Sequence, residues 1–80
     1  MTYTGTELSA LARLYCEHEG ISLAALGERI FNNHKFFKLL AAGKGAHSRK
    51  IEEASEWFEA NWPEGSRWPE DVIRAANEAA

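Results

Sequence analysis

The 80-residue sequence contains a single cysteine, Cys16, and no apolar run long enough to cross a bilayer. One cysteine cannot form a disulfide within the chain, and its presence alone fits a reducing compartment. The sequence also shows no leader of the basic, then apolar, then small-residue kind. We therefore expect a soluble, cytoplasmic protein, and at this length a single small core.

The residue patterns of a catalytic or metal centre are missing as well. We find no glycine-rich phosphate loop and no nucleophile placed beside a base. Two pairs could begin a metal site, Cys16 with His18 and His34 with His47, but neither has a further ligand at a useful spacing. We expect no enzyme activity, no metal and no cofactor.

Carboxylates are absent from residues 29–50, although the whole chain carries a formal net charge of −3. Outside this stretch, which we call the basic segment, the chain has three basic residues and all 12 acidic ones, a balance of −9. A cationic segment in an acidic chain favours a polyanionic partner, and the acidic remainder disfavours unspecific binding. The six cations of the basic segment are Arg29, Lys35, Lys38, Lys44, Arg49 and Lys50.

Apolar residues recur at helical spacing along the chain, and no segment shows the alternation of a strand. We expect an all-α fold, a small helix-turn-helix bundle of four to five helices. The helices are expected near residues 7–19, 23–31, 34–42, 49–62 and 69–80. The residues expected to face inward are Leu8, Leu11, Ala12, Tyr15, Leu23, Leu26, Gly27, Ile30, Phe36, Phe37, Leu40, Ile51, Ala54, Phe58, Trp62, Val72, Ile73 and Ala76, with Leu39 undecided.

Capping residues and glycines set the expected helix ends. Thr4 or Thr6 can cap the first helix, with Thr6 preferred, and Thr4 with Glu7 has the spacing of a capping box. Gly20 ends this helix and Ser22 caps the next. The remaining ends are marked by the Asn32-Asn33 pair, Gly43, Ser48, Pro63 and Pro69.

The second and third helices are short and separated by a tight turn, which is the helix-turn-helix plan. In that plan the second helix of the pair lies in the DNA major groove. Gly27 provides the small residue where another helix would cross closely. The outer side of residues 33–42 offers hydrogen-bond donors, and Ala41 and Ala42 allow close approach to a duplex.

Residues 8–65 resemble small phage-type repressors and Cro-like regulators. The resemblance is to short prophage-associated helix-turn-helix proteins whose last long helix ends in a "WF…NWP" stretch, here "EWFEANWPEG". It implies a dimeric transcriptional repressor that occupies a palindromic operator and needs no cofactor. It places base recognition on Asn33, His34, Lys35 and Lys38, and backbone contacts on Ser22 and residues 44–50.

The sequence departs from this family in the turn, where Phe31 or Asn32 replaces the usual glycine. Either an asparagine takes the left-handed conformation, or the turn is about one residue longer. Which of Asn32, Asn33 and His34 would reach a base edge stays open, and Arg29 either crosses the DNA backbone or pairs near Glu28. The candidate DNA-binding residues are Ser22, Arg29, Asn32, Asn33, His34, Lys35, Lys38, Lys44, His47, Ser48, Arg49 and Lys50.

Donor geometry assigns contacts within this set. Asn33 suits an adenine edge, and Lys35 or Lys38 suits the acceptors of guanine. Phosphate oxygens suit the Ser48 hydroxyl and the nearby cations, together with the exposed N–H groups at the start of that helix.

Trp57 lies to one side of its helix's apolar stripe, and Trp68 follows a Gly-Ser turn. They either pack under the C-terminal tail or form a homodimer interface, which a lone recognition helix would need in order to read a full operator. We therefore divide the chain into a DNA-binding domain, residues 1–65, and a tail or short helix, residues 66–80, as a candidate dimer element. An alternative function is a protein-binding module, such as a phage-encoded inhibitor or an antitoxin, that uses the acidic face of residues 49–62 or the tryptophan-rich tail.

Overall fold

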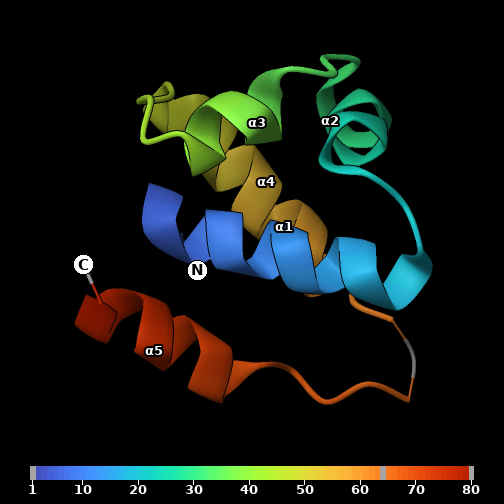
Figure 1. Ribbon diagram of the computed structural model, residues 1–80, viewed down its shortest axis with the longest axis vertical. Coiled ribbons are helices and arrows are strands. Elements are labelled where there is room, and N and C mark those ends of the chain that lie inside the picture. The colour runs from blue at the N-terminus through green and yellow to red at the C-terminus, as the bar shows by residue number, and fades with distance from the viewer. Residues whose placement is uncertain (1, 64, 80) are drawn as a thin grey trace.

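The computed structural model describes residues 2–63 and 65–79, and over these residues it contains five helices and no strand. This confirms the predicted all-α class. The helices are α1 (Gly5–Glu19), α2 (Leu23–Phe31), α3 (Phe36–Ala41), α4 (Ser48–Asn61) and α5 (Glu70–Ala79). The central helix is α1, which packs against each of the other four. In Figure 1, α2 and α3 lie above α1, α4 passes behind it and α5 lies below.

A capping box formed by Thr4 and Glu7 begins α1, so the prediction that Thr6 caps this helix is wrong. The Thr4 hydroxyl accepts a hydrogen bond from the Glu7 N–H at 3.1 Å, and Glu7 Oε1 accepts one from the Thr4 N–H at 2.7 Å. Glu7 Oε2 accepts a further bond from the Asn77 side-chain amide of α5 at 2.8 Å. Both carboxylate oxygens therefore accept hydrogen bonds, which offsets the cost of burying Glu7 and links α5 to the start of α1.

The core lies between α1 and the inner faces of the other helices. Most of the residues predicted to face inward are buried or half-buried, and Phe37 and Phe58 are almost fully enclosed. The prediction that Val72 faces inward is wrong: this residue of α5 is 36% exposed and lines an open groove beside α1. Sequence reasoning also missed Ser55, which is fully buried. Its hydroxyl donates to the Ile51 carbonyl at 2.8 Å and accepts from the Tyr3 N–H at 2.9 Å.

Two helix starts differ from the prediction. His47, not Ser48, occupies the N-cap position of α4, and it makes no side-chain capping bond. The third helix covers Phe36–Ala41 instead of residues 34–42, because residues 33–35 form the turn that leads into it. At the other end α4 stops at Asn61, with Trp62 extended before Pro63, as expected for a residue that precedes proline.

The aromatic residues form one connected cluster inside the chain. The ring centroid of Trp57 lies 5.3 Å from that of Tyr15, and the Trp68 ring lies 5.2 Å from Trp62 and 5.9 Å from Tyr3. Both Trp57 and Trp68 are half-buried by contacts within the chain. Their packing under the C-terminal tail, the first of the two arrangements that the sequence left open, stays a prediction, because Trp57 packs on Tyr15 of α1. A homodimer contact through either ring stays a prediction.

The C-terminal segment shares the core of the rest of the chain, because Ile73 of α5 is buried among the residues of α1. The predicted division at residue 65 stays a prediction, and residues 1, 64 and 80 of that division lie outside the described residues. Every helix in the described part of the chain is too short or too polar to cross a membrane.

Candidate nucleic-acid interface

The turn between α2 and α3 depends on Asn32. This residue takes the left-handed conformation, with φ 55° and ψ 36°, and among the described residues no other non-glycine has a positive φ. Its N–H donates to the Glu28 carbonyl at 2.9 Å and closes α2. The sequence offered two alternatives for the missing glycine, a left-handed asparagine or a longer turn. The left-handed asparagine is correct, since asparagine adopts this conformation more readily than most residues.

Gly27 lets the turn fold back onto α2. Its carbonyl accepts the Asn33 N–H at 3.2 Å, and a Cβ built on Gly27 would overlap the carbonyl oxygen of Asn33. The expectation of a close approach at Gly27 is confirmed. The approaching backbone is that of the turn, at Asn33 and His34, and not that of a crossing helix as predicted.

The Asn33 side chain helps to start α3. Its Oδ1 accepts a hydrogen bond from the Lys35 N–H at 3.0 Å, and its carbonyl accepts one from the Phe36 N–H at 3.3 Å. The side-chain oxygen thus serves the turn, while the exposed NH₂ group still offers donors. Next to it, His34 Nδ1 lies 3.9 Å from Glu28 Oε1, and both side chains are more than half exposed.

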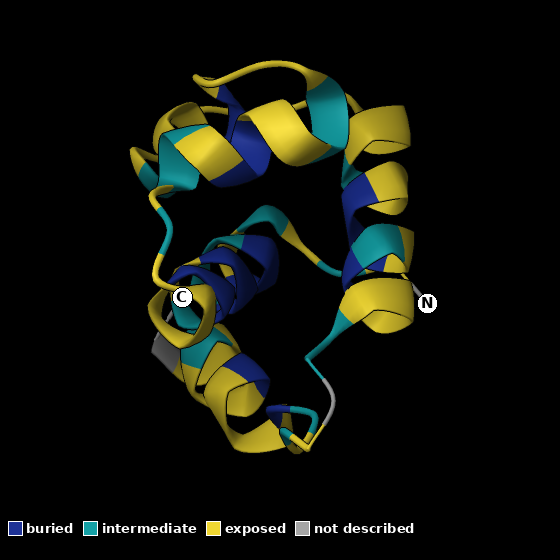
Figure 2. Cartoon of the chain, turned by 90° about the vertical axis from the view of Figure 1, so that its right-hand side faces the viewer, coloured by how far each residue is buried: buried dark blue, intermediate teal, exposed yellow. Residues whose placement is uncertain are grey.

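The two sides of α3 differ in character. Phe36, Phe37 and Leu40 are buried against the core, whereas Lys35 and Lys38 are exposed. Figure 2 shows the buried residues of the upper helices turned inward and the exposed ones on the outer surface. The side chains of both lysines therefore project into solvent on the outer side, as predicted from the helical period.

The start of α4 lies beside the end of α2. Lys50 Nζ is 4.7 Å from the centroid of the Phe31 ring, a cation–π contact that joins the two segments. The neighbouring residues Lys44, His47, Ser48 and Arg49 are all exposed. In Figure 1 the end of α2, the whole of α3 and the start of α4 share the upper part of the molecule, with α5 on the opposite side.

We call the group that gathers there the basic surface. None of its lysines and arginines lies within salt-bridge distance of a carboxylate in the described part of the chain. Glu52 and Glu53, one turn into α4, mark its acidic edge. The residues of the basic surface are Asn32, Asn33, His34, Lys35, Lys38, Lys44, His47, Ser48, Arg49 and Lys50.

Two predicted site residues lie elsewhere. Arg29 Nη1 donates a hydrogen bond to the Tyr15 hydroxyl of α1 at 3.3 Å, so its guanidinium turns toward α1. Ser22 caps α2 as predicted, with its hydroxyl accepting from the Ala25 N–H at 3.1 Å. Ser22 and Asn32 are the two end caps of α2, ten residues apart, which at 1.5 Å per residue is about 15 Å.

A polar contact joins His18 of α1 to Ser66, in the segment before α5. The Ser66 hydroxyl lies 2.7 Å from His18 Nε2, and His18 Nδ1 lies 3.6 Å from Glu19 Oε2, a contact that sequence reasoning missed. These are the residue types of a hydrolytic triad, but His18 is 46% exposed on an open surface and the grooves between the helices are lined by other residues. The contact instead links α1 to the segment before α5.

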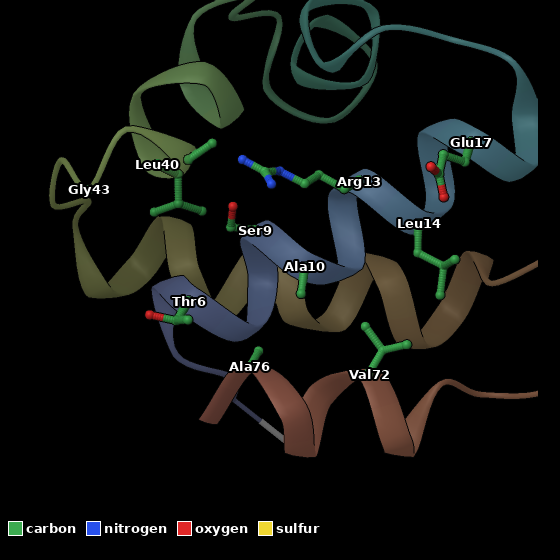
Figure 3. A pocket seen from close by; sticks show the side chains of 11 residues that line it. Thr6, Ser9, Ala10, Arg13, Leu14, Glu17, Leu40, Gly43, Val72 and Ala76 are labelled. Atoms are coloured by element: carbon green, nitrogen blue, oxygen red, sulfur yellow. The ribbon is translucent and has the colours of Figure 1, made fainter. Parts of the chain in front are cut away.

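A groove of about 630 Å³ lies between α1, α3 and α5. Figure 3 shows Arg13 and Glu17 on its α1 side, with Leu14, Val72 and Ala76 toward α5. It contains no cysteine, histidine or serine beside a base that could attack a substrate. The single thiol is elsewhere and buried, and burial raises the pKa of Cys16, an effect that the charge of Arg29 partly offsets.

Among the described residues, no three His, Cys, Asp or Glu side chains gather around a common point. Comparison of the chain with known protein families, with curated proteins and with solved structures found no match. The resemblance to phage-type repressors therefore stays a prediction, and the basic surface is the feature on which a function can be argued.

Proposed function

We propose that this protein binds double-stranded DNA through the basic surface, with α3 in the major groove, and acts as a transcriptional repressor of the phage type. One observation carries the proposal. The carboxylate-free stretch of residues 32–50 folds into one end of the molecule, with its lysines and Arg49 exposed and, among the described residues, without a carboxylate partner. Such cations on one surface attract a polyanion, and this attraction weakens as the salt concentration rises.

The dimensions of α3 suit this role. Six residues give a helix about 9 Å long, and the major groove, about 12 Å wide, admits an α-helix. Because Phe36, Phe37 and Leu40 fix the inner side, Lys35 and Lys38 are held on the side that would face the bases. Both can donate to the O6 and N7 acceptors of guanine.

The start of α4 would hold the phosphate backbone. Lys44, Arg49 and Lys50 surround a helix start whose N-cap, His47, provides no side-chain acceptor. The first N–H groups of α4 are thereby left to other acceptors, and the positive end of the helix dipole adds to the local charge. These contacts would position α3 without reading sequence.

A six-residue recognition helix reads only a few base pairs, so we propose that two copies bind a palindromic operator with half-sites about 34 Å apart. Occupancy of the operator would block polymerase, and no cofactor is needed. The protein-binding alternative receives less support, since the tail tryptophan Trp68 packs against Tyr3 and Trp62 of its own chain.

Replacing Lys38 by alanine tests the base-reading role of α3. The Lys38 side chain is exposed and has no hydrogen-bond or ion-pair partner among the described residues, so the variant should fold normally. It should lose about 1–3 kcal/mol of discrimination between operator and random DNA. Asn33→Ala is less clean, because it also removes the acceptor of the Lys35 N–H. The operator is first obtained by selection from a random duplex pool, and discrimination is then measured by competition in fluorescence anisotropy.

The matched control is Arg74→Ala, which removes one positive charge from an exposed position on α5. It should preserve discrimination. Equal losses of discrimination in the two variants, or a random pool that yields no preferred duplex, would remove α3 from the proposed interface.

A further inference from the structure

Leu39 is exposed in the middle of the basic surface. Its side chain is 48% exposed, although it belongs to a helix whose other large apolar residues are buried. The inner side of α3 is already filled by Phe36, Phe37 and Leu40. Leu39 therefore lies on the outer side of α3, next to Lys38.

The local backbone explains why nothing covers Leu39. The Lys44 N–H donates to the Leu39 carbonyl at 2.9 Å, the Gly43 N–H donates to the Leu40 carbonyl at 3.1 Å, and Gly43 has φ 85°. This is a Schellman motif, in which the residue two positions after the helix cap is commonly apolar and packs on the third-last residue of the helix. In this chain these two residues are Lys44 and Leu39, so the apolar contact is missing. Leu39 is left uncovered, with Lys35 one turn before it and Lys38 and Lys44 as its other neighbours.

An apolar side chain surrounded by lysines fits a ligand that presents an apolar group between anionic groups. In the DNA major groove that apolar group is the C5 methyl of thymine, which lies between two rows of phosphates. We propose that Leu39 recognises thymine by packing on this methyl group and so determines part of the operator sequence. The inference rests on the proposed DNA binding and adds to it the recognition of a methyl group, which the hydrogen-bond donors of the lysines do not read.

The test uses the duplex selected from the random pool, labelled with fluorescein, and the same duplex with thymines replaced one at a time by deoxyuridine. Deoxyuridine keeps every hydrogen bond and removes only the methyl. At one position in each half-site, wild-type protein should bind the deoxyuridine duplex about fourfold more weakly, the effect of one buried methyl. Leu39→Ala should bind the thymine duplex about fourfold more weakly and show no further loss with deoxyuridine.

Val72→Ala serves as the control, because Val72 is an exposed apolar residue on α5, away from the basic surface. It should keep the wild-type ratio of affinities, and circular dichroism should show all three proteins equally helical. The proposal is overturned if wild-type protein binds the duplex but ignores every thymine methyl, or if Leu39→Ala keeps the wild-type ratio. A wild-type protein that binds no duplex at all overturns this inference together with the proposed function.

Discussion

A variant in which Lys44, Arg49 and Lys50 are all replaced by glutamine should bind duplex DNA about 10²–10³-fold more weakly than wild-type protein at roughly 0.1 M salt. Each of these cations is exposed near the start of α4 and is expected to neutralise one phosphate. Because each phosphate contact contributes about 0.9 to the slope of log K against log salt, the slope should fall by about 2.7. Anisotropy titrations at several salt concentrations measure both quantities.

The chain offers a control with the same net charge. Replacing Arg13, Arg67 and Arg74 by glutamine also removes three positive charges, so both variants carry a formal charge of −6. These three arginines lie outside the basic segment, and their loss should leave the slope nearly unchanged. If the two variants weaken binding equally, DNA responds to the net charge of the protein and not to the basic surface.

Gly27→Ala should lower the free energy of unfolding by about 1–3 kcal/mol, the usual cost of adding atoms where none fit. Alanine is favoured over glycine inside a helix by about 1 kcal/mol, so propensity alone predicts the opposite sign. The new methyl would overlap the backbone carbonyl of Asn33, which cannot move without displacing the turn into α3. Urea denaturation measures the change.

Gly45→Ala is the appropriate comparison, because a Cβ at Gly45 would meet no atom within 4 Å. It should leave stability unchanged or raise it slightly, since alanine restricts the unfolded chain more than glycine does. A Gly27→Ala protein as stable as wild type would show that the turn does not pack tightly on α2. The same variant should also bind DNA more weakly, because Asn33 and Lys35 belong to the displaced turn.

The sequence predicts the helices and most of the core because helical periodicity is a local property. Helix ends were less predictable where two local signals compete. Thr4 and Thr6 can both cap α1, and the choice of Thr4 is reinforced by Asn77, which reaches Glu7 from the other end of the chain. A contact between residues so far apart in sequence cannot be predicted from the residues around the cap.

In the candidate site, too, some positions follow from local sequence and others depend on contacts between helices. The outward positions of Lys35 and Lys38 follow from the inward positions of Phe36, Phe37 and Leu40, so the sequence predicts them. Arg29 could not be assigned in this way, because its direction depends on the Tyr15 hydroxyl of a different helix.

Leu39 was also ambiguous from sequence. Its position at the edge of the apolar stripe leaves both sides open, and its exposure depends on how the turn at Gly43 and Lys44 closes α3. The inner side of α3 is filled by Phe36, Phe37 and Leu40 only when the helix packs on the core, so the residues around Leu39 do not settle on which side it lies.

The most direct test of the proposed interface is an NMR titration of ¹⁵N-labelled wild-type protein with the duplex selected from a random pool. We expect the amide shifts to change chiefly across the turn, α3 and the first turn of α4, while those of α5 stay in place. Changes centred on α5 or on the acidic face of α4, or no change at a saturating concentration of duplex, would contradict the proposed interface.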